Sequence, residues 1–129
     1  MAETEVSIRI DLKTGDRIGP GKIALLEAIS KAGSITAAAR SMNMSYRRAW
    51  LLVDEINKLL SEPAVTAAVG GAGGGHAMLT PVGRKIIQHY HSIEMLTRAA
   101  ARGEFQAFGK LLRGYVGPDP ANHTKRIQK

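Results

Sequence analysis

The fold is decided by residues 33–50, GSITAAARSMNMSYRRAW. Two serines in this stretch, Ser34 and Ser45, each stand directly before a helical pattern. A serine hydroxyl there can accept a hydrogen bond from a free backbone N–H of the first helical turn, so each serine predicts the start of a helix. Asn43 and Met44 are expected to form the turn between the two helices. Two helices joined by a tight turn are typical of a helix-turn-helix.

The sequence on both sides of this stretch predicts the other elements of one small domain. Apolar and polar residues alternate near the N-terminus, with the period of two that a half-buried strand has. Two β-prone stretches flank a run of glycines, which is typical of a hairpin with a flexible tip. In chain order we expect a strand over 6–12, helices over 20–32, 34–39 and 45–61, a hairpin of 65–69 with 77–80, and a helix from residue 81. This order is that of a winged helix-turn-helix, here a mainly α fold with a small β hairpin and a long C-terminal helix.

The composition indicates a protein that binds a polyanion. The chain has 18 Lys and Arg against 11 Asp and Glu, which gives a formal net charge of +7. Such a charge favours nucleic acid or an anionic membrane surface. No apolar run approaches the roughly 20 residues that cross a bilayer, and no basic leader precedes an apolar segment, so we expect a cytoplasmic protein with no membrane partner. The lack of cysteine excludes disulfides and thiolate metal sites.

The helix that begins after Ser45 is the expected recognition helix, because this helix of a winged helix-turn-helix enters the major groove. Tyr46, Arg47 and Arg48 lie in its first turn, where recognition side chains reach base edges. Arg47 and Arg48 point away from the predicted core, and an arginine fork can bond O6 and N7 of guanine. The alternative is an ordinary solvated helix face.

The same helix has a predicted core-facing side. At about 100° per residue, this side carries Tyr46, Ala49, Trp50, Val53, Ile56 and Leu60. The opposite side carries Arg47, Arg48, Leu51, Glu55 and Lys58. We therefore predict that Trp50 anchors the core rather than contacting nucleic acid.

Further DNA contacts are expected from hydroxyl groups and from the glycine loop. Ser34, Thr36 and Ser45 could bind phosphates, although helix capping explains the two serines equally well. Glycines of a wing would let the backbone approach sugar and phosphate, and the expected contacts are Gly71, Gly73 and Gly74. A phosphate-binding loop would need Lys-Ser or Lys-Thr after its last glycine, whereas His76 and Ala77 follow here.

No catalytic or metal-binding residues are predicted. His89 and His91 are two positions apart and therefore lie on different faces of a helix, so they cannot hold one metal ion together. No paired carboxylates and no Ser/His/Asp arrangement have supporting local structure. We expect a protein that is not an enzyme.

The helix from residue 81 is expected to join two copies of the chain. Thr80 can cap this helix, and Pro81 is well tolerated at its first position. Its apolar positions exceed what one small core needs, which predicts a homodimer. The expected interface residues are Ile86, Tyr90, Ile93 and Leu96. We expect Gly103 to interrupt the helix before a short amphipathic segment around Phe105 and Phe108.

Two segments together resemble the N-terminal domain of the molybdate-responsive ModE-type regulators. The first runs from Gly33-Ser34-Ile35 through SYRRAW (45–50) to DEIN (54–57), and the second is GGAGGGHAMLT (70–80) with Gly83-Arg84. The resemblance implies a dimeric, LysR-like winged helix-turn-helix that regulates transcription in molybdenum uptake or molybdoenzyme expression, with double-stranded DNA as its partner. It also implies that residues 45–48 open the recognition helix, that residues 70–75 form the wing tip, and that Arg84 lies among the DNA contacts.

Two departures from the family limit what the resemblance implies. The family's wing often carries a basic residue between its glycine groups, where this chain has Ala72. Full-length members also carry molybdate-binding modules, and about thirty residues after the dimer helix are too few for one. We therefore expect no cofactor in this chain, with molybdate sensing missing or located elsewhere.

These expectations give a domain division and an alternative function. We expect a DNA-binding domain with its dimer helix over 1–103, and an amphipathic segment with a flexible basic tail over 104–129. The alternative to a promoter-binding regulator is an accessory protein that regulates by associating with a larger regulator.

Overall fold

A computed structural model of the chain describes residues 6–68 and 75–114, which form two compact units. Residues 8–92 make the larger unit, and the described residues of the smaller unit are 6–7 and 93–114. None of the helices in the described ranges combines the length and apolarity that a membrane-spanning segment requires. The domain limits expected from the sequence, 1–103 and 104–129, stay a prediction.

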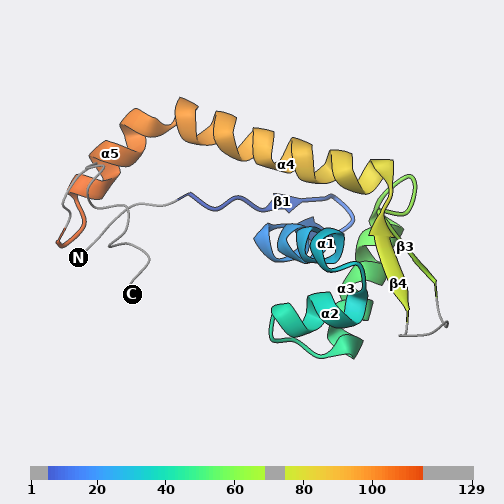
Figure 1. Cartoon of the computed structure of the whole chain (residues 1–129). Coiled ribbons are helices and arrows are strands. Elements are labelled where there is room, and N and C mark those ends of the chain that lie inside the picture. The colour runs from blue at the N-terminus through green and yellow to red at the C-terminus, as the bar shows by residue number, and fades with distance from the viewer. Residues whose placement is uncertain (1–5, 69–74, 115–129) are drawn as a thin grey trace. The chain divides into compact units, whose positions relative to one another are not determined.

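The first three helices of the larger unit are α1 (Pro20–Ala32), α2 (Ile35–Ser41) and α3 (Tyr46–Leu59) (Figure 1). Gly33 ends α1 in the left-handed conformation, with φ of 78°. The Ser34 hydroxyl accepts a hydrogen bond from Ala37 N at 3.0 Å, and the Ser45 hydroxyl accepts one from Arg48 N at 3.1 Å. The helix starts predicted from these two serines are therefore confirmed.

A hairpin packs beside these helices and is tied to two of them. It consists of β3 (Val65–Ala68) and β4 (His76–Leu79), which pair antiparallel. Ala77 N of β4 donates to Gly33 O at 2.9 Å, which joins the hairpin to the turn between α1 and α2. The Asn57 side chain of α3 donates to Val65 O at 3.1 Å and accepts from Ala64 N at 2.8 Å. The base of the hairpin is thus fixed to α3, and the mainly helical arrangement is compatible with a small winged-helix domain.

The core of the larger unit lies between the three helices and this hairpin. Its fully buried members are Leu25, Leu26, Ile29, Ala38, Ala49 and Ala64, with Ile35, Ala39, Val53, Ile56, Val65, Ala77 and Leu79 around them. The predicted core positions Ala49, Val53 and Ile56 of α3 are confirmed.

Two aromatic residues assigned to the core-facing side of α3 lie at the surface instead. Tyr46 is 53% exposed and Trp50 is 45% exposed, so the prediction that Trp50 anchors the core is wrong. The buried row of α3 runs through Ala49 and Val53, and Trp50 lies about 60–100° around the helix from both. The predicted apolar stripe was therefore too wide.

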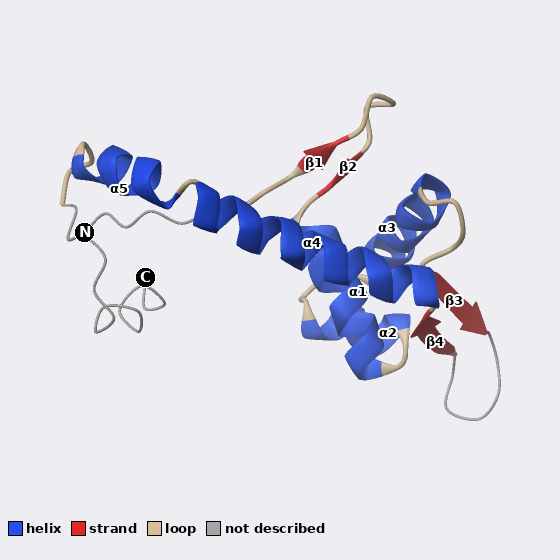
Figure 2. Cartoon of the chain, turned by 90° about the horizontal axis from the view of Figure 1, so that it is seen from above, coloured by secondary structure: helices blue, strands red, loops and turns tan. Residues whose placement is uncertain are grey.

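The N-terminal strand pairs over a shorter range than the alternation suggests. Burial alternates over residues 6–12, as predicted, but the paired residues are only β1 (Ile10–Asp11) and β2 (Arg17–Ile18). Figure 2 shows this hairpin apart from the β3–β4 hairpin. The sequence did not predict β2, because a strand of two residues is too short to show an alternating pattern. This strand follows a turn in which Gly15 has φ of 99°.

The last two helices are α4 (Pro81–Ala100) and α5 (Arg102–Lys110). Thr80 Oγ1 accepts from Gly83 N at 3.0 Å, so the predicted cap of α4 is confirmed. The predicted interruption at Gly103 is wrong, since the break lies at Ala101 and Gly103 is inside α5. Gly103 lies in the first turn of α5, outside the helix interior where glycine is most unfavourable.

Gly83 gives a stability prediction. A Cβ at this position would overlap the carbonyl oxygen of Ala64, which is held by a hydrogen bond from Thr80 N at 2.9 Å. We expect Gly83→Ala to lower the free energy of unfolding by about 1–3 kcal/mol. The matched control is Gly21→Ala in α1, where a Cβ meets nothing within 4 Å. It should raise that free energy by up to about 1 kcal/mol, since alanine is the better helix former. Urea unfolding of both variants is the measurement, and equal midpoints would contradict the close approach.

Candidate nucleic-acid interface

The first turn of α3 presents two exposed arginines, Arg47 and Arg48. Neither has an ion-pair partner within the described part of the chain. They stand where free backbone N–H groups and the helix dipole already favour an anion. The helix has no acidic residue in this turn. The two guanidinium groups are therefore available for a negatively charged partner.

The other charges along α3 are paired within the chain. Lys58 Nζ lies 2.8 Å from Asp54 Oδ2, one turn away on the helix. The hydrogen bond and the charge of Asp54 raise the pKa of Lys58 above its usual value. Lys22 Nζ of α1 lies 3.3 Å from Glu55 Oε1. The uncompensated positive charge of α3 is thus confined to its N-terminal end.

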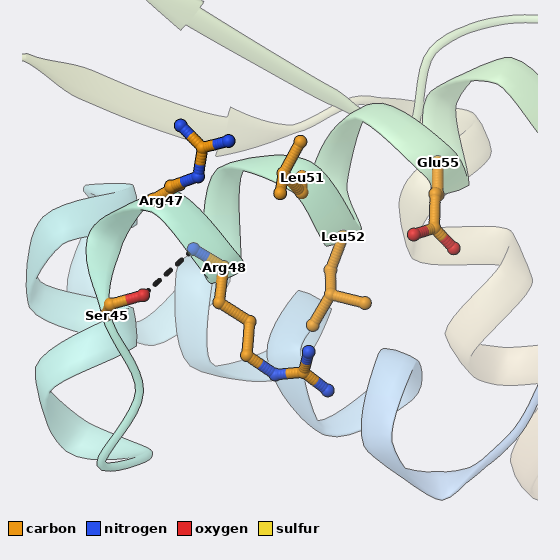
Figure 3. A pocket seen from close by; sticks show the side chains of 6 residues that line it. All are labelled: Ser45, Arg47, Arg48, Leu51, Leu52 and Glu55. Atoms are coloured by element: carbon orange, nitrogen blue, oxygen red, sulfur yellow. Dashed lines mark hydrogen bonds between the residues drawn. The ribbon is translucent and has the colours of Figure 1, made fainter.

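A hollow on the surface of α3 contains both arginines (Figure 3). Its lining residues are Ser45, Arg47, Arg48, Leu51, Leu52 and Glu55. The Arg47 and Arg48 side chains leave the helix in different directions, and Leu51 and Leu52 follow them along it. The hollow therefore has cationic groups near the start of the helix, an apolar middle, and the paired Glu55 beyond.

The structure brings three of the predicted DNA-contact residues, Ser45, Arg47 and Arg48, to this hollow. Thr36 is exposed in the first turn of α2, which Ser34 caps. The DNA-contacting roles of these residues and of the exposed Tyr46 stay predictions.

The remaining predicted contacts belong to the wing and to the start of α4. Arg84 Nη1 donates to Leu79 O at 3.1 Å, so one of its donors already serves the fold. Gly71, Gly73 and Gly74 of the wing tip lie outside the described residues, as does the tail from residue 115.

Sequence reasoning missed the apolar part of the hollow. Leu51 was assigned to the outward side of α3 but was not chosen as a contact residue. The available signal was its spacing, since Leu51 lies one turn after Arg47 and so shares its exposed row. Leu52, which is partly buried against the core, also lines the hollow.

The four predicted dimer residues have different surroundings. Tyr90 is buried, and its hydroxyl donates to Ile8 O at 2.6 Å, so this side chain serves the fold of its own chain. Ile86 is partly buried against the core. Ile93 and Leu96 are exposed on α4. Of the four predicted dimer residues, the two whose side chains are open to a second copy thus lie in the C-terminal half of α4.

The two histidines of α4 have different surroundings. His91 Nε2 is 2.9 Å from Glu27 Oε2 of α1, and the His91 ring meets the Tyr90 ring edge-on. His89 is exposed. No group of three or more His, Cys, Asp or Glu side chains in the described ranges is placed to hold a metal ion.

Comparison with known proteins finds relatives named as molybdenum-pterin-binding proteins, as a molybdenum transport protein and as transcriptional regulators. The chain is 52% identical over 82 residues to the molybdenum-pterin-binding protein MopB of Rhodobacter capsulatus, covering 64% of this chain and 30% of MopB. It is 37% identical over 125 residues to the molybdenum transport protein ModE of Azotobacter vinelandii, covering 87% of this chain and 46% of that protein. It is 34% identical over 98 residues to the DNA-binding transcriptional dual regulator ModE of Escherichia coli, covering 76% of this chain and 37% of that protein. The chain thus spans less than half the length of these curated relatives, and no family model matches it.

Proposed function

The chain is homologous to part of the ModE and Mop proteins, and from this premise we propose that it is a homodimeric, sequence-specific DNA-binding regulator of molybdenum-related genes. The observation that carries the proposal is the exposed pair Arg47 and Arg48, which has no ion-pair partner in the described chain and stands at the start of α3. The hairpin of β3 and β4 beside this helix supports a winged mode of binding.

In the proposed mechanism, the N-terminal turn of α3 enters the major groove. One arginine fork bonds a guanine edge and so reads sequence, whereas an arginine on a phosphate fixes position only. The Ser45 hydroxyl already accepts a hydrogen bond from Arg48 N, so its proton is free for a phosphate oxygen. The wing adds contacts to the sugar-phosphate backbone.

The test is to remove each arginine separately. Arg47→Ala and Arg48→Ala should each weaken binding to a duplex selected from a random pool, while thermal unfolding stays unchanged, because both side chains are exposed. Removal of an arginine that reads a base should lower affinity for the selected duplex by about fivefold to a hundredfold and change affinity for random duplex little. A phosphate-binding arginine should weaken both equally.

The matched control is Arg17→Ala in β2, which removes the same charge from another exposed position of the larger unit. It should leave discrimination between the two duplexes unchanged. If both α3 variants bind both duplexes as the parent does, α3 is not the recognition helix.

A second function is supported by the exposed apolar residues of α4. The chain would then associate with a larger regulator through Ile93 and Leu96 rather than bind promoters. Light scattering with and without the selected duplex separates the two functions. A monomer that binds no duplex favours this second function.

A further inference from the structure

We propose that Leu51 is a specificity-determining residue that reads the 5-methyl group of thymine in the major groove. This inference rests on the proposed DNA-binding function and adds to it the kind of base that the apolar part of the α3 surface recognises. The two arginines can account for contacts to guanine and to phosphate. They do not account for Leu51, which lies between them and Glu55 along α3.

Leu51 is placed where a base-reading side chain would be. It follows Arg47 by one helical turn, and it lies on the side of α3 opposite the buried row of Ala49, Val53 and Ile56. Its side chain is 44% exposed although it is fully apolar. Leu52, the next residue of α3, lines the same hollow and is partly buried against the core. Leu51 is therefore an exposed apolar group within a hollow that also contains the two arginines.

The charges around Leu51 select the partner. Arg47 and Arg48 stand on its N-terminal side without ion-pair partners in the described chain, whereas the Glu55 carboxylate beyond it is bound by Lys22 at 3.3 Å. A complementary surface must therefore present an apolar group next to negative charge. On the edges of base pairs in the major groove, the thymine methyl is such a group, and phosphates line the groove on both sides.

The experiment compares thymine with uracil, which lacks only this methyl group. A duplex is selected from a random pool with the full chain, and each thymine in it is replaced in turn by uracil. For the parent protein, we expect one thymine of the half-site at which uracil raises Kd about fourfold, which corresponds to one buried methyl group. Replacing the equivalent thymine of the other half-site as well should raise Kd about fifteenfold.

Variants assign this effect to one side chain. Leu51→Ala should abolish the uracil effect at that thymine, and the fold should persist because the residue is half exposed and alanine is a strong helix former. Leu51→Met should keep the effect, because its side chain remains apolar and of similar size. The matched control is Leu111→Ala, which truncates an exposed leucine that follows α5 and should leave the ratio of the two Kd values unchanged.

The outcomes separate this inference from the function on which it rests. If a sequence is selected but uracil has no effect at any position, or if Leu51→Ala keeps the full effect, Leu51 does not read thymine and the DNA-binding function stands. If no sequence is enriched from the random pool, the proposed function fails and this inference fails with it.

Discussion

Charged replacements at Ile93 and Leu96 are expected to convert a dimer into monomers and to lower affinity for the selected duplex by about a hundredfold to ten-thousandfold. Ile93 is 41% exposed and Leu96 is 70% exposed, in the C-terminal half of α4. A dimer holds its second recognition helix near the second half-site, so dissociation removes this effective concentration without touching α3. The selected duplex should accordingly be an inverted repeat, with half-sites one or two helical turns apart.

Sedimentation velocity on Ile93→Glu and Leu96→Glu measures the association state, and a binding titration measures Kd. The control is Gln88→Glu, which adds the same charge at an exposed polar position of α4 and should leave the dimer intact. A parent protein that is monomeric at micromolar concentration would refute the interface. So would charged variants that keep the mass of a dimer.

Affinity for DNA is expected to fall about a thousandfold or more between 50 and 200 mM salt, if the dimer makes roughly 6–10 phosphate contacts. The physical reason is the release of condensed counterions when cationic side chains neutralise phosphates. The net charge of +7 and the two α3 arginines without ion-pair partners in the described chain supply that positive charge. The measurement is Kd for the random duplex at several salt concentrations.

The slope of this dependence also distinguishes the roles of the arginines. A variant that removes one phosphate contact per subunit should flatten the slope of log Kd against log salt by about two for the dimer. Thermal unfolding of the free protein over the same range serves as the control, because it shows whether salt acts on the fold itself. A Kd that does not change with salt would contradict the DNA-binding function.

The local structure of α2 and α3 could be predicted because its signals act over a few residues. Ser34 and Ser45 accept hydrogen bonds from the first helical turns, and Gly33 takes the left-handed conformation that ends α1. The same holds for Thr80 at the start of α4. A cap depends on the residue type and on the three positions after it, so no knowledge of the rest of the chain is needed.

The placement of the candidate site could be predicted in part. The exposure of Arg47 and Arg48 followed from their position relative to the apolar positions of α3. Leu51 was on the predicted outward side. Single apolar residues are common at protein surfaces, so its exposure alone does not predict a binding role. The hollow and the Lys22–Glu55 ion pair, which give Leu51 its surroundings, depend on the packing of α1 against α3.

The order of the helices, the capped starts of α2, α3 and α4, the positive charge and the two arginines at the start of α3 all follow from local patterns in the sequence. The tertiary structure was needed to show that Trp50 lies at the surface, that Tyr90 is buried with its hydroxyl on Ile8 O, and that Gly83 lies close to Ala64. Capping and helical periodicity are set by neighbours in the chain, whereas burial depends on which distant segments come together and how closely their side chains let them approach.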